Sequence, residues 1–145
     1  MRRIRSVDTS PELAVRRFLH KSGFRFRLHA KGLPGKPDIV LPALRVCVLI
    51  HGCFWHGCKK CVDGTRRVKS RSEYWTAKIQ GNKDRDIKHA EALKSLGWRV
   101  YVLWECEIRQ MRPLTTLTRS LRKRRERLRA TPRAPLESVS NGSAR

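Results

Sequence analysis

The sequence predicts an α/β fold in which a mixed β-sheet is flanked by helices. An apolar run at 46–50 is bounded by turn signals, which is typical of a strand buried on both faces. A second run, 98–104, is rich in β-branched and aromatic residues and predicts another strand. Helical patterns precede and follow these runs. We therefore expect one domain in the order helix, three strands, helix, strand, helix.

The first half of the chain supplies one helix and three strands. Ser10-Pro11-Glu12 predicts a helix start, with serine as the cap and proline in the first turn, and Gly23 ends this helix. Apolar and basic residues alternate over 24–28, which indicates a half-buried strand. After a turn rich in Gly and Pro come a short strand, Asp38–Leu41, and the central strand, Arg45–His51.

The second half supplies two helical regions around one strand. Ser72 can cap a helix, and Gly81-Asn82 could interrupt it before a second helical stretch that ends at Gly97. After the strand at 98–104, Pro113 begins a very basic helix that runs to about Arg129.

These elements set the expected domain boundaries. We expect the folded domain to span residues 1–129, with a short basic arm at 1–8. Residues 130–145 are poor in large apolar side chains and predict a disordered tail.

The charge of the chain indicates a polyanionic partner. The net charge is +22, from 34 Lys and Arg against 12 Asp and Glu. Residues 119–145 hold nine basic residues and two acids, so they carry +7 and the remaining 118 residues carry +15. Because the basicity extends through the predicted domain, nucleic acid is the expected partner.

Membrane and secreted classes do not fit the sequence. No apolar stretch approaches the length of a membrane span. Five cysteines without a secretory signal indicate a reducing compartment, with thiols or metal rather than disulfides. We therefore expect a cytoplasmic protein.

Four cysteines predict a structural zinc site. Cys58 and Cys61 form a Cys-x-x-Cys pair, the usual half of a tetrahedral zinc site. Cys53 could curl back as a third ligand, and Cys106 is the best candidate for the fourth. Cys47 lies within the central strand and predicts a buried thiol. The alternative interpretation of the pair is redox chemistry.

A candidate catalytic site lies where the strands end. Asp38 begins a strand beside the one that ends in His51, and an aspartate there can bind a hard divalent ion such as magnesium. The main-chain oxygen of Ile50 could complete that site. The Asp/Glu-x-Lys pattern common in nucleases is absent from this strand, so His51 or His56 must transfer the proton. Taken alone, Asp38 is more typical of a turn residue after proline, and His51 or His56 alone fits a structural or zinc-related role equally well.

Phe54 and Trp55 are two large aromatic residues between Cys53 and His56. They could belong to the core. They could instead form a wedge that enters between base steps, at a lower cost where pairing is already poor. Trp75 on the following helix could join this wedge.

Five segments give the sequence a recognisable family resemblance. In chain order they read MRRIRSVDTSPE, LPGKPDIVLP, HGCFWHGCKKC, EYWTAKIQGNKDRD and GWRVYVLWEC. The match covers about residues 2–112 and includes these segments, whose order and density make chance similarity improbable. The chain resembles the very-short-patch repair endonucleases, bacterial enzymes that nick DNA at T:G mismatches.

This resemblance implies a restriction-endonuclease-like fold and a set of roles. Asp38 would bind magnesium with the main-chain oxygen of Ile50, a position where some members have threonine. His56 would be the catalytic histidine, His51 would assist at the scissile phosphate, and Glu12 would support the site from the first helix. Zinc would be held by Cys53, Cys58, Cys61 and Cys106. The intercalating aromatic residues would be Phe54, Trp55 and Trp75.

Two functions from different classes follow. The preferred one is a magnesium-dependent DNA mismatch endonuclease that nicks one strand at T:G mismatches and initiates very-short-patch repair. We expect it to be a monomer that acts on duplex DNA, with other mismatch-repair proteins as candidate partners. The alternative is a non-catalytic, zinc-containing module that binds nucleic acid. A redox protein fits least, because it does not need the basic surface.

Overall fold

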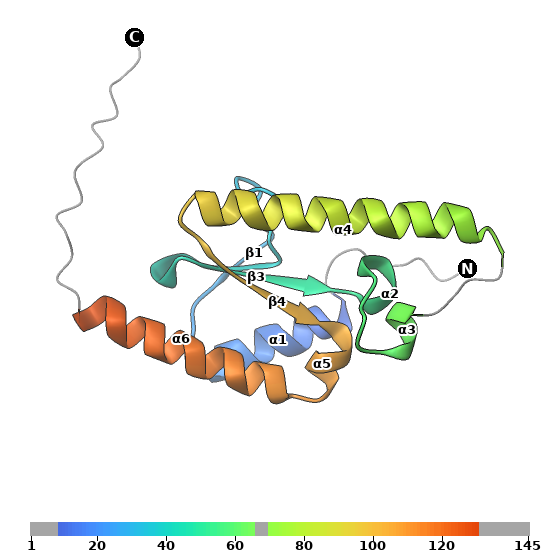
Figure 1. Cartoon of the computed structure of the whole chain (residues 1–145). Coiled ribbons are helices and arrows are strands. Elements are labelled where there is room, and N and C mark those ends of the chain that lie inside the picture. The colour runs from blue at the N-terminus through green and yellow to red at the C-terminus, as the bar shows by residue number, and fades with distance from the viewer. Residues whose placement is uncertain (1–8, 66–69, 131–145) are drawn as a thin grey trace, which may run out of the picture.

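The computed structural model describes residues 9–65 and 70–130 and confirms a mixed α/β fold, with a four-stranded sheet between helices (Figure 1). The strands lie in chain order across the sheet; the first three pair antiparallel, and the third and fourth pair parallel. The strands are β1 (Arg27–Leu28), β2 (Ile39–Leu41), β3 (Val46–His51) and β4 (Arg99–Trp104). The predicted arm and tail lie outside the described residues, except for Ala130.

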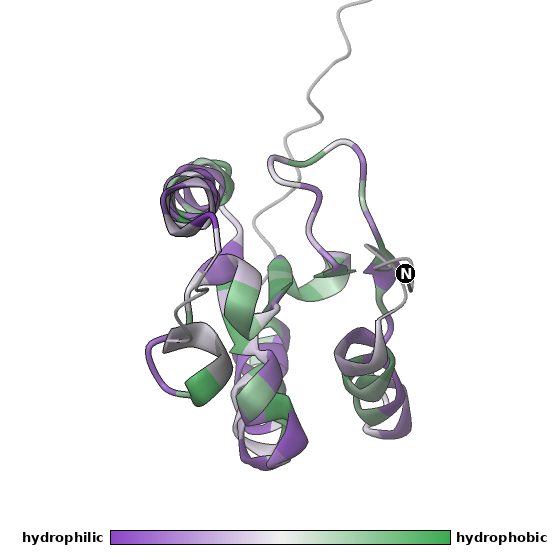
Figure 2. Cartoon of the chain, turned by 90° about the vertical axis from the view of Figure 1, so that its right-hand side faces the viewer, coloured by the Kyte–Doolittle hydropathy of each residue, from purple (hydrophilic) through white to green (hydrophobic). Residues whose placement is uncertain are grey.

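Helices cover both faces of the sheet. The long helix α4 lies on one side, and α1 and α6 lie on the other (Figures 1 and 2). The described helices are too polar or too short to cross a bilayer. They are α1 (Ser10–Lys21), the 3₁₀ turn η1 (Pro42–Leu44), α2 (Cys53–His56), α3 (Val62–Thr65), α4 (Ser72–Ser95), α5 (Glu105–Arg109) and α6 (Arg112–Ala130).

The alternation of side chains along β3 divides the core between the two faces. Val46 and Val48 are fully buried in the larger cluster, together with residues of α1 and α6 such as Leu121. Cys47 points to the opposite face and packs in a smaller cluster with Leu93 of α4. The strand is thus buried on both faces as predicted, and Cys47 is a buried thiol whose pKa burial raises to about 11.

The predicted interruption at Gly81-Asn82 is wrong. Helix α4 runs without a break through 24 residues. A glycine inside a helix costs only about 0.5–1 kcal/mol relative to alanine. The side chain of Asn82 donates a hydrogen bond to the carbonyl of Trp55 at 2.8 Å, so Asn82 contacts α2 without interrupting α4.

The strand predicted at 24–28 is shorter than expected. Only Arg27 and Leu28 pair with β2. The amide of Phe24 donates to the carbonyl of Leu19 at 3.0 Å, so this residue completes the end of α1, and its ring is buried in the core. The helix starts also differ slightly, since Thr9 and Arg71 precede the first helical residues, Ser10 and Ser72.

The packing predicts that α6 is part of the core. Leu121→Ala should lower the free energy of unfolding by about 2–5 kcal/mol, because a fully buried leucine leaves a cavity. Leu128, on the same helix, is 42% exposed, and Leu128→Ala should change it by less than about 0.5 kcal/mol. Denaturant unfolding measures both, and equal effects would contradict the docking of α6.

Candidate functional site

The parallel pairing of β3 and β4 brings the functional loops together. His51, the last residue of β3, is in register with Trp104, the last residue of β4. Cys53 and Cys106 each follow two residues later, at the same edge of the sheet. Residues more than fifty positions apart in the sequence therefore meet at one end of the fold.

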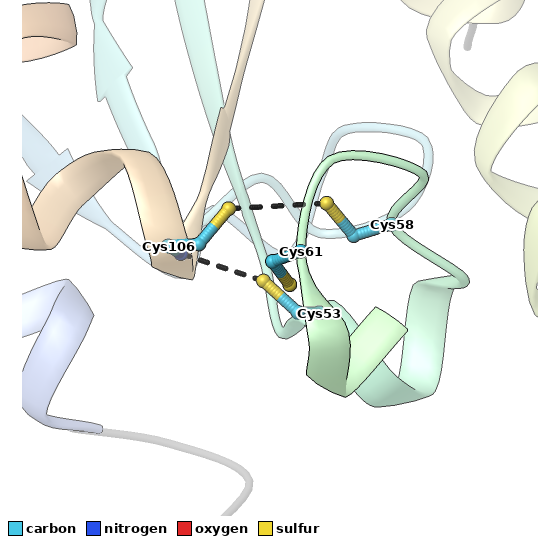
Figure 3. Close-up of side chains that lie close together, drawn as sticks. All are labelled: Cys53, Cys58, Cys61 and Cys106. Carbon is cyan, nitrogen blue, oxygen red and sulfur yellow. Dashed lines mark hydrogen bonds between the residues drawn. The ribbon is translucent and has the colours of Figure 1, made fainter. Parts of the chain in front are cut away.

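The four cysteines predicted as zinc ligands form one cluster (Figure 3). Their Sγ atoms all lie within 4.8 Å of one another, and the Sγ atoms of Cys58 and Cys106 are 3.9 Å apart. A tetrahedral zinc with bonds of about 2.3 Å to sulfur would separate its ligands by about 3.8 Å. The cluster can therefore hold a metal ion. An arrangement of four close thiols fits an isolated redox pair at Cys58 and Cys61 less well.

The surrounding backbone supports the cluster. The amide of Cys106 donates to the Sγ of Cys53, and the amide of Lys60 donates to the Sγ of Cys58, both at 3.4 Å. Burial raises the pKa of Cys53 and of Cys106, whereas a backbone hydrogen bond from Gly64 lowers that of Cys61. A Cβ atom at Gly64 would lie 2.0 Å from the carbonyl oxygen of Cys58, so the close approach of α3 to the Cys58 backbone requires glycine there.

A cavity of about 500 Å³ lies beside the cysteine cluster at the end of β3. All residues predicted for catalysis line it. They come from α1, from the segment before β2, from β3 and from α2. They are Glu12, Asp38, Ile50, His51 and His56, and Trp55, Asp86 and Glu105 also contribute.

Two stacked histidines and an aspartate form one wall. The rings of His51 and His56 are parallel, with centroids 4.2 Å apart. Nδ1 of His56 is 2.5 Å from Oδ2 of Asp86, and Nε2 of His51 is 3.9 Å from Oδ1 of the same carboxylate. Because an ionised carboxylate only accepts hydrogen bonds, Nδ1 of His56 donates, and in the neutral ring Nε2 then carries the lone pair.

His51 is the more buried of the pair. Burial, with a smaller effect of His56, lowers the pKa of His51 to about 4, and Asp86 only partly opposes this shift. His51 is therefore neutral at pH 7. Its Nδ1 is buried and has no hydrogen-bond partner among the described residues. Its ring also contacts Trp104 edge-on at a centroid distance of 5.2 Å.

Carboxylates form a second wall. Oδ2 of Asp38 accepts a hydrogen bond of 2.7 Å from the amide of Ile50, so β3 fixes this side chain. Ligand atoms of Glu12, His29 and Asp38 lie within 4.8 Å of one another. Burial raises the pKa of Asp38 above its ordinary value, and the charge of Glu12 adds to the shift although the Ile50 amide opposes it. Two adjacent carboxylate oxygens suit a hard cation. Glu12 also pairs with Arg16 at 3.2 Å.

The three predicted DNA-binding aromatic residues form a half-buried cluster with Tyr74. Phe54, Trp55 and Trp75 contact one another with centroid separations of 5.2–5.6 Å. Phe54 and Trp55 lie in helix α2, a single turn whose end at Gly57 has a positive φ of 64°. Nζ of Lys78 lies 5.7 Å from the Trp55 ring centroid and places positive charge over this surface.

The sequence interpretation assigned no role to Asp86 or to His29. The signal for Asp86 was helical spacing, because it follows Trp75 by eleven residues, or three turns, and so shares its face of α4. The predicted break at Gly81-Asn82 hid this relation. For His29, which lies just after β1, no comparable spacing exists, because its place beside Asp38 depends on the pairing of β1 with β2.

Comparison with known proteins identifies the family. A family model described as DNA mismatch endonuclease Vsr matches residues 1–62. The type II nicking enzyme V.XorIIP of Xanthomonas oryzae pv. oryzae is 48% identical over 121 residues, which are 83% of this chain and 88% of the relative. The DNA mismatch endonuclease Vsr of Escherichia coli K12 is 38% identical over 115 residues, covering 79% of this chain and 72% of the relative. The chain therefore belongs to the Vsr family of DNA mismatch endonucleases.

Proposed function

We propose that the protein nicks one strand of duplex DNA at T:G mismatches by magnesium-dependent hydrolysis, on a restriction-endonuclease-like fold, and so initiates very-short-patch repair. The observation that carries the proposal is the single cavity that joins Asp38 to the pair His56–Asp86 and is bordered by Trp55. Family membership and the net charge of +22 support DNA as the substrate.

Proton transfer falls to His56 in this proposal. Asp86 fixes the ring by accepting from Nδ1, which leaves Nε2 to take a proton from the attacking water. The water oxygen then bonds to phosphorus, and the bond from phosphorus to the leaving sugar oxygen breaks. His51, neutral and stacked on His56, would donate or accept a hydrogen bond at a phosphate oxygen.

Magnesium would be held by Asp38, with Glu12 close enough to support it and the main-chain oxygen of Ile50 as a further ligand. When bound, it would orient water and offset charge on the phosphate. The residues fit because a cation would relieve the repulsion between the buried carboxylate of Glu12 and the half-buried carboxylate of Asp38.

Zinc is the ion proposed for the cysteine cluster, where four sulfur ligands would form a closed, structural site. It would tie α2 to α5, so the helix that carries His56 would be fixed relative to β4. Its role would be stability, without participation in the reaction.

The aromatic cluster offers a way to sense the mismatch. Trp55 lines the catalytic cavity and also contacts Phe54 and Trp75. A wedge made by these rings would enter a poorly paired step more readily than a matched one. Asn82 of α4 donates a hydrogen bond to the carbonyl of Trp55, the residue before His56. The proposed wedge and the proposed catalytic histidine are therefore fixed to α4 together.

The first test measures nicking of T:G and T:A duplexes with and without magnesium. Asp38→Ala should abolish nicking, and His56→Ala should lower the rate about 10²–10⁴-fold, while both keep DNA affinity. Asp86→Asn should also slow nicking, because it removes the acceptor that orients His56. Asp84→Asn, exposed on the same helix, is the matched control. Wild-type nicking by Asp38→Ala in magnesium would reject the catalytic role of Asp38, whereas no nicking by the unmodified protein would favour the non-catalytic binding module.

The second test concerns zinc. Protein purified without chelator should contain about one zinc per chain, and Cys106→Ser should lower both zinc content and melting temperature. Cys47→Ala should keep the zinc, since this thiol is buried elsewhere in the core. Metal analysis that finds no zinc in the unmodified protein would reject the assignment.

The third test concerns mismatch preference. Trp55→Ala should fold and keep zinc but lose roughly tenfold in the ratio of T:G to T:A nicking rates, within the range of about 1–3 kcal/mol for base–aromatic stacking. Trp55→Phe should recover part of the ratio. An unchanged ratio would contradict the wedge, and loss of folding, seen by circular dichroism, would assign Trp55 to the core.

A further inference from the structure

A second hollow lies at the opposite end of the sheet from the catalytic cavity. Its volume is about 410 Å³, and it is lined by Lys94, Gly97, Trp98, Arg99, Val100 and Arg124. Three of these six residues are cationic, and the lining contains no acid. They come from the end of α4, the start of β4 and the second half of α6, which Figure 1 shows far from α2 and α3.

The strand register places the two sites apart. Arg99 is in register with Val46 at the start of β3, whereas the catalytic cavity lies around His51 at its end. Five residue steps of about 3.3 Å separate these positions by about 17 Å along the sheet. The hollow is therefore a separate feature and no part of the catalytic site.

The cations of the hollow keep N–H donors that are available to a ligand. Arg124 donates through Nε to the carbonyl of Leu44, which leaves the other N–H groups of its guanidinium. Arg45 stacks over the Trp98 ring at 4.5 Å and donates to the carbonyl of Leu96 at 3.0 Å, so the indole that lines the hollow is itself fixed. Among the described residues, Lys94 and Arg99 are exposed and make no ion pair.

Helix α6 extends the positive surface. Arg122 and Lys123 are exposed in the turn that contains Arg124, and Arg129 is exposed near the helix end. Residues 122 to 129 span about 10 Å of the helix at 1.5 Å per residue, so these cations are spread over the helix surface rather than confined to one point. Several separated cations match a repeated anion better than a single small one.

We propose that the hollow lined by Lys94, Arg99 and Arg124 is a second binding site for the phosphodiester backbone of nucleic acid. The phosphates could belong to a flanking segment of the duplex in the catalytic cavity or to a separate duplex. This inference rests on the proposed function only for the choice of DNA as the polyanion.

The test compares Lys94→Gln/Arg99→Gln with a control of equal charge loss, Arg17→Gln/Lys88→Gln, which removes exposed cations of α1 and α4 outside the hollow. Binding is measured over a range of salt, without magnesium, on fully matched duplexes of one and of four helical turns. Each phosphate contact contributes about 0.9 to the slope of log affinity against log salt, so the test variant should lose up to about 1.8. A bridging assay scores capture of labelled duplex by immobilised duplex through the protein.

A loss confined to the longer duplex assigns the site to flanking DNA, and a loss of bridging assigns it to a separate duplex. An equal loss in the control variant, or an unchanged slope together with unchanged bridging, would overturn the proposal. Because the binding and bridging assays use matched DNA without magnesium, their results can be interpreted even if the protein does not nick DNA. Nicking at saturating T:G substrate should be the same in the test variant as in the unmodified protein.

Discussion

The parallel pairing of β3 with β4 is the constraint on which the rest of the site depends. It aligns the last residues of the two strands, so that the chain leaves both at one edge. Cys53 and Cys106 then lie where one metal ion can reach them, and His51 packs against Trp104. A shift of β3 by one residue in its register with β4 would turn every side chain of β3 to the opposite face of the sheet, and His51 would point away from α4.

Helix α2 concentrates three roles in four residues. Cys53 belongs to the cysteine cluster, Phe54 and Trp55 to the aromatic surface, and His56 to the catalytic wall. A helix this short cannot be stable alone. Its stability must come from outside, through the cysteine cluster at one end and the contact of Asn82 with Trp55 on α4. The residues proposed for sensing, cleavage and metal binding are therefore structurally coupled.

The sequence predicted the parts of this protein that carry strong local signals. The strand at 46–51 is marked by its apolar run, and the cysteine ligands by their spacing. Helix α2 was missed because four residues between glycines show no periodicity. Asp86 was missed because glycine was given more weight as a helix breaker than it has within a helix that packs on a sheet. Such features depend on tertiary contacts, which local patterns do not encode.

The distribution of charge gives the last constraint on mechanism. The chain has only 12 acids, yet Glu12, Asp38, Asp86 and Glu105 all line the catalytic cavity. A basic exterior attracts DNA over a distance set by the screening length, about 8 Å at physiological salt. Within the cavity the carboxylates would repel the scissile phosphate. A divalent cation would resolve this opposition, because it can bind the acids and the phosphate at once. The clustered acids on a basic protein thus favour metal-assisted hydrolysis over a binding role alone.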